Sequence, residues 1–172
     1  RFSAAHSTII LNNTNISELI ENKSYKRIPK IISLNNNENE EILSWKATHD
    51  GYMDNFKRII KRKLIISKKH QAINGEDSII CHKLNSKKAL YNIRFHLTPI
   101  CTCLLTNNQK SVLIKTKLNQ SWIFSSENKL TLEESIYINN GRRVERTKQI
   151  VISGYASLPK TIEKWSISKI KT

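Results

Sequence analysis

The stretch LYNIRFHL, residues 90–97, decides the fold class because from its second residue onward apolar and polar side chains alternate. Successive side chains of an extended strand point to opposite faces, so alternation gives one apolar and one polar face. The apolar side chains are Tyr91, Ile93, Phe95 and Leu97, and the polar ones are Asn92, Arg94 and His96. The segment therefore predicts a half-buried β-strand.

The same signal recurs along the chain. In 162–170, Trp165 and Ile167 share a face with Glu163, while the intervening residues are Lys and Ser. Short runs rich in Ile, Val, Leu, Tyr and Trp predict further strands. The expected strands are 6–12, 30–34, 42–49, 58–67, 72–81, 90–97, 100–105, 110–117, 120–126, 130–138, 147–155 and 162–170. Only 14–21 is expected to form a short helical turn, capped by Asn15 or Ser17.

Clusters of Asn, Ser and Gly separate these runs and predict turns, because Asn and Gly tolerate the positive φ of tight turns. The expected turns are 35–37 within the polar loop 35–41, 74–75, 107–108, 125–128 and 139–141. Many short strands at this spacing are typical of a sandwich or a barrel. We predict that 1–172 is one all-β domain, an antiparallel β-sandwich.

The chain is strongly basic, with a net charge of +15 over 172 residues and a pI near 9.9. One interpretation is that Lys, Asn and Ile are all abundant because AT-rich codons encode them, with the lysines spread over solvated faces. The other is a surface that attracts polyanions, either nucleic acid or acidic glycan. No known nucleic-acid-binding motif is present, so we expect no specific nucleic-acid partner.

The chain has three cysteines, Cys81, Cys101 and Cys103. A low and odd number of cysteines argues against a disulfide framework. Cys101 and Cys103 fall on one face of an expected strand, where they are either small buried hydrophobes or a metal or redox pair. No secretory signal and no apolar run of membrane-spanning length is visible. The chain starts at Arg1 in what reads as a folded element, so we expect a fragment of a longer protein.

Four short clusters carry polar side chains suited to chemistry: residues 5–8 (AHST), 49–52 (HDGY), 75–77 (GED) and 94–97 (RFHL). No nucleophile–base pair, phosphate loop or paired metal ligands can be identified from them alone. A single His is more often a hydrogen-bonded structural residue than a ligand or a base. Glu76 or Asp77 is expected to cap neighbouring amides or to pair with the basic strand 58–63.

Taken in order, the clusters are far more specific. RFSAAHST at the start is followed by SWKATHDGY, a basic strand ending in KRKL, GED, IRFHL with Pro99, Trp122 with Phe124, LEESIY and QIVISG. This ordered set resembles the C-terminal domain of heparinase II/III-like proteins from about residue 1 to 170. It is most similar to the version found in alphaproteobacteria.

The resemblance implies an antiparallel β-sandwich that follows an α/α-toroid of helices in a polysaccharide lyase. Family members cleave acidic, uronate-containing glycans by β-elimination, and the helical domain supplies most catalytic residues. Those residues are therefore expected upstream of Arg1, and the chain alone is expected to be inactive. The resemblance also implies an acidic polysaccharide and the helical toroid as partners, and a location in the cell envelope or periplasm.

The resemblance further implies a metal, usually zinc, held by two His and one Asp. His6 matches the last of these ligands, and the other two are expected upstream. Zinc takes about four ligands, so we expect zinc in the intact protein and no tight binding to this chain alone. The alternative for His6 is a strand-edge histidine bonded to the backbone. The chain departs from the family at Thr98, where relatives have a second His, and at Lys57 and Ile60, where they have Gly and His.

His49, Tyr52, Arg94 and His96 are the candidate substrate contacts, lining a cleft toward the helical domain. The alternative is a structural role for each of them, such as pairing of Arg94 and His96 with carboxylates. The three tryptophans, Trp45, Trp122 and Trp165, are expected in the core rather than as sugar-stacking platforms. The alternative function for the whole chain is a non-enzymatic module that binds polyanions or braces the toroid.

Overall fold

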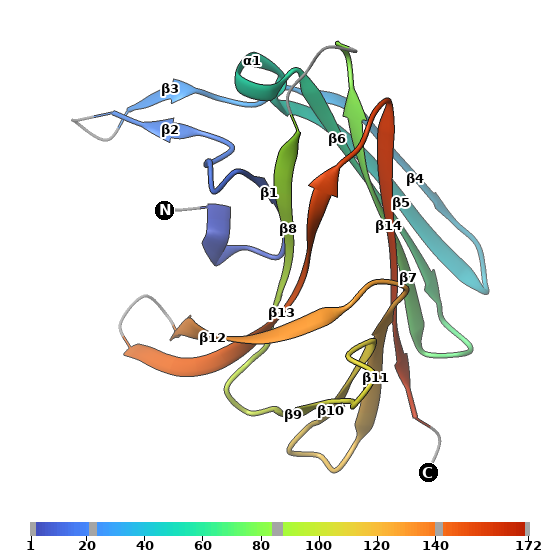
Figure 1. The fold of residues 1–172 in the computed structure, drawn as a ribbon. Coiled ribbons are helices and arrows are strands. Elements are labelled where there is room, and N and C mark those ends of the chain that lie inside the picture. Colours follow the sequence, from blue (N-terminus) through green and yellow to red (C-terminus); the bar gives the residue numbers. More distant parts are fainter. Residues whose placement is uncertain (1–2, 21–23, 84–87, 140–142, 171–172) are drawn as a thin grey trace.

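The computed structural model describes residues 3–20, 24–83, 88–139 and 143–170. Nearly all of this is antiparallel β-structure in two sheets packed face to face, which confirms the predicted β-sandwich (Figure 1). The helical segments are a 3₁₀ turn η1 (Ser3–Ala5) and a single α-turn, α1 (Met53–Phe56). Among the described residues, no helix is long and apolar enough to cross a membrane.

The larger sheet has eight strands in the order β4-β5-β6-β7-β14-β11-β10-β9, each antiparallel to its neighbours. Its first half is built from consecutive hairpins, and β14 then joins them to the β9–β11 meander. The strands are β4 (Ile31–Glu38), β5 (Ile42–Tyr52), β6 (Arg58–Ser67), β7 (Ala72–Cys81), β9 (Thr102–Leu105), β10 (Ser111–Lys115), β11 (Ser121–Ser126) and β14 (Lys160–Lys169).

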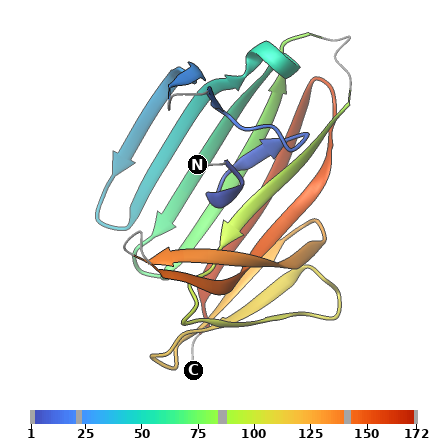
Figure 2. The same ribbon diagram turned by 90° about the vertical axis from the view of Figure 1, so that its left-hand side faces the viewer.

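The smaller sheet has four strands in the order β1-β8-β13-β12. They are β1 (Ile9–Leu11), β8 (Ala89–His96), β12 (Leu130–Asn139) and β13 (Arg143–Ala156). A separate two-stranded ribbon pairs β2 (Glu18–Leu19) with β3 (Tyr25–Arg27). Figure 2 shows that the smaller sheet and the N-terminal segment cover only part of the larger sheet, and that β4 and β5 extend beyond them.

The core lies between the sheets and uses the alternation seen in the sequence. The β8 side chains Tyr91 and Ile93 are buried, and Phe95 packs against Phe124 and Trp165 of the larger sheet, with ring centroids 4.7 Å away in both cases. Burying alternate apolar side chains from two facing sheets is the main stabilising contribution in such a sandwich.

The predicted loop and turn at 35–41 are wrong in their first half, because Asn35, Asn36 and Asn37 continue strand β4. β4 is an edge strand, so polar side chains can be extended there without leaving a core position empty. The reversal comes later, where the Asn39 side-chain oxygen accepts hydrogen bonds from the backbone N–H groups of Glu41 and Ile42. Asn39 thus supplies the turn chemistry that we had assigned to the preceding asparagines.

The predicted turn at 74–75 is also wrong, because Gly75 lies in the middle of strand β7. It pairs with Leu64 on one side and Trp165 on the other. A Cβ atom on Gly75 would lie 2.1 Å from Cε2 of Trp165. The glycine therefore makes room for the indole ring rather than for a positive φ.

The short helical turn expected at 14–21 is absent from residues 14–20, the part that the structure describes. Asn12 and Asn13 adopt positive φ and turn the chain away from β1. The Asn15 side-chain oxygen accepts a hydrogen bond from the N–H of Ser3 instead of capping a helix. Long-range pairing thus outcompetes the local cap that the sequence suggested.

The prediction that the tryptophans lie in the core is correct for two of the three. Trp122 and Trp165 pack against the core as expected. Trp45 does not, because it lies on β5 beyond the cover of the smaller sheet and is 45% exposed. Leu34, on the neighbouring edge strand β4, is exposed for the same reason.

Candidate functional site

The residues that flank His6 are held firmly, while the His6 side chain itself is exposed. The Ser7 carbonyl accepts a hydrogen bond from Nη1 of Arg62 at 2.6 Å, and the Ser7 hydroxyl accepts one from the His96 N–H at 3.1 Å. The Thr8 carbonyl accepts the N–H of Arg94. Contacts from both sheets therefore fix the backbone around His6 and leave its ring available.

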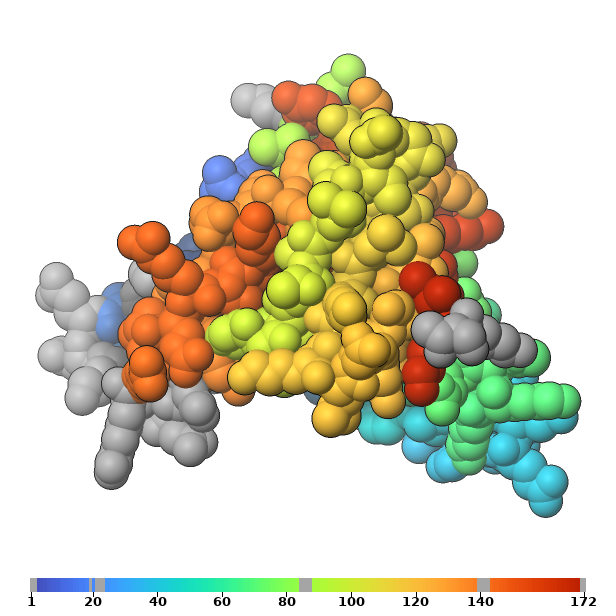
Figure 3. Space-filling view, turned by 90° about the horizontal axis from the view of Figure 1, so that it is seen from below, coloured from blue at the N-terminus to red at the C-terminus, as the bar shows by residue number. Residues whose placement is uncertain are grey.

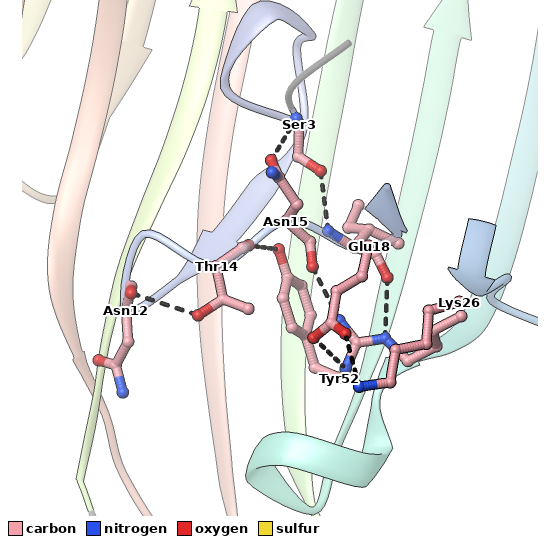
Figure 4. Close-up of polar contacts among 9 residues, drawn as sticks. Ser3, Asn12, Thr14, Asn15, Glu18, Lys26 and Tyr52 are labelled. Carbon is pink, nitrogen blue, oxygen red and sulfur yellow. Dashed lines mark hydrogen bonds and ion pairs between the residues drawn. The ribbon is translucent and has the colours of Figure 1, made fainter. Parts of the chain in front are cut away.

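The same N-terminal segment is pinned further along, as Figure 4 shows. Ser3 donates its N–H to the Asn15 side chain and accepts the N–H of Ile16 on its hydroxyl. Arg27 donates to the carbonyls of Asn15 and Ile16. Residues 3–16 are thus held as one strap against the sheets rather than as a loose terminus.

His96 connects this strap to β12. Its Nε2 lies 3.0 Å from the Ala4 carbonyl, to which it donates, and its Nδ1 lies 2.9 Å from the Ser135 hydroxyl. Burial lowers the pKa of His96, and the neighbouring charges of Arg94 and His6 lower it further, against the opposing effect of the Ala4 carbonyl. Both ring nitrogens are engaged, so His96 has a structural task in this conformation.

Arg94 is paired with a carboxylate of the same sheet. Its Nη1 lies 2.7 Å from Oε2 of Glu133 on β12, and its side chain is only 14% exposed. Gln149 donates to the same Glu133 oxygen at 3.2 Å. The Nε of Arg94 is buried and has no hydrogen-bond partner among the described residues. A substrate carboxylate would therefore have to compete with Glu133 for this guanidinium.

His6 and His96 meet at a pocket of about 610 Å³. The pocket lies between the N-terminal strap, the end of β8 and the distal half of β12. Its lining is mostly apolar and consists of Ala5, His6, His96, Leu97, Thr98, Ile136, Tyr137 and Ile138. The two histidines are the main polar groups of an otherwise hydrophobic hollow, which is the usual composition of a ligand site.

His49 and Tyr52 lie elsewhere, at the end of β5. Tyr52 is fully buried, and its hydroxyl lies 3.1 Å from the Ile9 carbonyl oxygen and 3.1 Å from that of Thr14. Figure 4 shows the contact with Thr14. Burial raises the pKa of Tyr52 to about 12. In this conformation Tyr52 has no surface from which to contact a sugar, and it anchors the strap instead.

His49 is half-buried, and its Nδ1 accepts the backbone N–H of Gly51 at 3.1 Å. Burial lowers the pKa of His49, and the charge of Arg62 acts in the same direction, while Asp50 opposes both. His6 and His96 thus line one pocket with Arg94 close to His96, whereas His49 and Tyr52 do not line that pocket.

Sequence reasoning missed Arg62, which links the site to the core. Its Nε and Nη2 donate to the two Asp77 oxygens at 2.6 and 2.9 Å, and its Cζ lies 5.8 Å from the Phe95 ring. Trp165 donates its indole N–H to Asp77 at 2.9 Å. The Arg62–Asp77 pair confirms the expected pairing of the GED cluster with the basic strand. Nothing in the sequence showed that Arg62 also donates a hydrogen bond to the Ser7 carbonyl.

A second pocket, of about 340 Å³, lies on the underside of the molecule, where β9 rests against β12 and β13 (Figure 3). It is lined by Pro99, Cys101, Thr102, Cys103, Glu134, Arg146, Thr147 and Lys148. Burial raises the pKa of the Cys103 thiol, which disfavours the thiolate needed for metal binding or redox chemistry.

The described residues contain no group of three or more His, Cys, Asp and Glu side chains placed to hold a metal. Of the two histidines at the pocket, His96 has both ring nitrogens engaged by Ala4 and Ser135, whereas the His6 ring is exposed. One imidazole does not hold zinc at useful affinity.

The fold defines a two-sheet antiparallel β-sandwich domain. A family model, heparinase II/III-like C-terminal, matches residues 1–166, and the chain belongs to this family. No curated protein gives a significant match. The narrower resemblance to the alphaproteobacterial version stays a prediction.

Solved structures agree on the fold. Heparan sulfate lyase HepC from Pedobacter heparinus matches with a TM-score of 0.78 at 12% identity, over 100% of this chain and 25% of that one. The heparinase III BT4657 gene product matches with a TM-score of 0.74 at 11% identity, over 100% and 25%. The GH36 α-galactosidase AgaB from Geobacillus stearothermophilus matches with a TM-score of 0.50 at 5% identity, over 91% and 30%. The chain thus spans about a quarter of the length of the heparinases that it matches.

Proposed function

We propose that the chain is the β-sandwich part of a polysaccharide lyase that cleaves uronate-containing glycans by β-elimination together with a helical domain. The observation that carries the proposal is the family match over residues 1–166, combined with heparinases of which this chain covers only a quarter. A similar sandwich in a glycosidase is a reminder that the fold alone does not determine the chemistry.

The chemistry supports a division of labour between the two domains. β-Elimination needs a base, an acid and a group that neutralises the uronate carboxylate, all placed around one sugar. The pocket offers the exposed imidazole of His6, while the imidazole of His96 is bonded to Ala4 and Ser135, and Arg94, which does not line the pocket, is paired with Glu133. We therefore expect the chain to complete a cleft and to be inactive alone.

His6 is the side chain of this pocket that is free to act. We propose that it supplies one ligand to a zinc ion whose remaining ligands come from outside residues 1–172. Its exposed ring and firmly held backbone fit this role, because a metal ligand needs a fixed position and an open nitrogen. We also propose a location in the cell envelope or periplasm, where a lyase meets such glycans.

The test compares the chain alone with the longest gene product that contains it. Both are incubated with heparan sulfate, alginate and other uronate polymers, and the unsaturated uronate product is followed by its ultraviolet absorbance. We expect product from the longer protein only. His6→Ala in that protein should lower activity and zinc content, whereas His70→Ala, in the exposed β6–β7 turn, should change neither.

Three outcomes each contradict one part of the proposal. Product formation by the chain alone means that a complete site exists within residues 1–172. A longer protein that binds these glycans but cleaves none of them favours the alternative, a module that binds polyanions or braces a helical domain. If the longer protein keeps its zinc after His6→Ala, His6 is not a zinc ligand. The lyase proposal is then judged by the activity measurement alone.

A further inference from the structure

The outer face of the larger sheet, turned away from the smaller sheet, carries a group of lysines that we call the lysine face. It consists of Lys46 on β5, Lys61 and Lys63 on β6, and Lys160 and Lys164 on β14. These side chains alternate with the inward-pointing Arg62, Asp77 and Glu163, so the strand pleat directs them outward.

The register places these charges in a row. Lys46 is opposite Lys63, Lys63 is opposite Glu76, and Glu76 is opposite Lys164. Neighbouring strands lie about 4.8 Å apart, so the row extends for about 14 Å across the sheet. Glu76 is the one carboxylate within it, and Lys61 and Lys160 flank the row on the same face.

This arrangement works against stability. Like charges directly opposite each other on neighbouring strands are destabilising, and Lys46 and Lys63 are such a pair. Burial lowers the pKa of Lys61, and Lys46 and Lys160 lower it further against the weaker opposite effect of Glu76. In the described part of the chain, none of the five lysines takes part in an ion pair. The fold does not need this cluster, which points to an external anion.

Beside the lysines runs a row of short polar side chains. Ser125 pairs with Ser166, which pairs with Asn74 on β7. A shallow pocket of about 350 Å³ opens here, and Lys164 lines it together with these three residues. A second hollow, of about 200 Å³, continues toward Lys63 and shares Asn74 and Lys164. Hydroxyl and amide groups beside ammonium groups match sugar hydroxyls beside carboxylates or sulfates.

We propose that the lysine face binds an acidic polysaccharide and forms a second contact surface, separate from the His6 pocket. The ligand class rests on the proposed function, whereas the location rests on the charges and the register. The face lies on the far side of the larger sheet from the N-terminal strap (Figure 1). A polymer held there leaves the pocket free and raises the local substrate concentration. Trp165 lines both hollows, but its ring packs against Phe95 and Phe124 in the core instead of standing among the lysines, which disfavours base stacking and thus single-stranded nucleic acid.

The test uses the 172-residue chain and two variants with the same net charge. The first is Lys46→Gln/Lys63→Gln/Lys164→Gln on the lysine face. The matched control is Lys69→Gln/Lys110→Gln/Lys129→Gln, at exposed positions in turns between strands. Binding of a labelled heparan sulfate oligosaccharide is titrated at several salt concentrations, with a DNA oligonucleotide of equal charge as the competing ligand.

We expect the lysine-face variant to bind the glycan roughly fivefold more weakly or worse, with a shallower salt dependence, while the control loses less than about twofold. The melting temperature at low salt should rise in the lysine-face variant and not in the control, since only the lysine-face variant relieves like-charge repulsion.

Equal losses of glycan affinity in both variants mean that diffuse charge causes the binding, and they overturn the proposal. Tighter binding of DNA than of glycan, lost with the same lysines, overturns the glycan assignment. Neither result depends on lyase activity, so a failure here is distinct from a failure of the proposed function.

Discussion

Glu76 and Asp77 are neighbours on strand β7, and their surroundings are opposite. Asp77 points inward, is fully buried, and accepts hydrogen bonds from both Arg62 and Trp165. Glu76 points outward between Lys63 and Lys164 on the lysine face. Asp77 has a single cationic partner, Arg62 on β6, and lies opposite the buried Glu163 on β14, whereas Glu76 lies between a lysine on each flanking strand.

The difference shows that charge on this sheet has two uses. On the inner face the Arg62 guanidinium and the Asp77 carboxylate meet in a bidentate pair, and the second buried carboxylate, Glu163, is held by Tyr91 and Asn128, so these buried charges have matched partners. On the outer face the charges are unmatched, which water tolerates and an anionic ligand can use. Predictions that separate the two faces therefore test the whole interpretation.

The largest effect is expected for Asp77→Asn. The change keeps the shape but leaves Arg62 without its counter-charge, and breaking a buried pair in this way costs about 3–5 kcal/mol. Since the Arg62 side chain is 24% exposed, the lower end of this range, about 3 kcal/mol, is expected. Urea unfolding followed by tryptophan fluorescence measures the loss. Asn74→Ala, an exposed position on the outer face of the same strand, is the control and should change stability by less than about 0.5 kcal/mol.

A smaller loss is expected for Gly75→Ala. The added methyl group would overlap the Trp165 ring, and overpacking of this kind costs about 1–3 kcal/mol. The cause can be isolated with Trp165→Leu, because the glycine substitution should cost much less once the ring is gone. Additive effects of the two changes would show that the close approach of Gly75 to Trp165 is not what makes this position restrictive.

Gly75 also illustrates what the sequence could and could not predict. Alternation along 90–97 and 162–170 was sufficient for the strands and for the inward faces of β8 and β14, because that signal is local. The Asn–Gly pair at 74–75 has the composition of a turn, and only the partner strand supplies the indole ring that makes the glycine necessary. Contacts between distant strands are not visible in a local pattern.

As with the strands, only part of the candidate site could be predicted from the sequence. The resemblance pointed to His6, and alternation placed Arg94 and His96 on one face of a strand, where the structure has them. The burial of Tyr52 was not predictable, because it depends on the strap of residues 3–16 folding back over β5. The role of Arg62 was hidden for the same reason.

The third prediction concerns pH, and it again separates buried from exposed groups. His49 has a lowered pKa in the folded protein, so below about pH 6.5 the unfolded chain takes up a proton before the folded one does. Its stabilising contribution is therefore complete above that pH and is lost as the pH falls. Protonation also removes the Nδ1 acceptor of the Gly51 N–H.

Unfolding free energies measured between pH 5 and 8 should thus rise with pH, and His49→Gln should flatten this rise. For one group the slope does not exceed about 1.4 kcal/mol per pH unit, since at most one proton is taken up. His96→Gln is expected to act in the same direction. His70→Gln, in an exposed turn, should leave the slope as it is, and a slope unchanged in His49→Gln would remove this histidine as its cause.

Glu76→Gln is expected to have the smallest effect on stability, and it is also the most direct test of glycan binding by the lysine face. Removing the one carboxylate within the lysine row costs at most about 0.5 kcal/mol, because Glu76 attracts Lys63 and Lys164 only across a sheet surface that water screens. Glycan binding should change in the opposite direction and become roughly twofold tighter at low salt, since Glu76 repels an anion and partly neutralises Lys63 and Lys164. Heparan sulfate titrations of the wild type and the variant measure this directly.

Glu127→Gln, at the rim of the 350 Å³ pocket, should give a smaller gain because Glu127 lies outside the row. Weaker glycan binding in Glu76→Gln would mean that the carboxylate organises the lysines for the ligand, and the row would then act as a structured site rather than as an excess of charge.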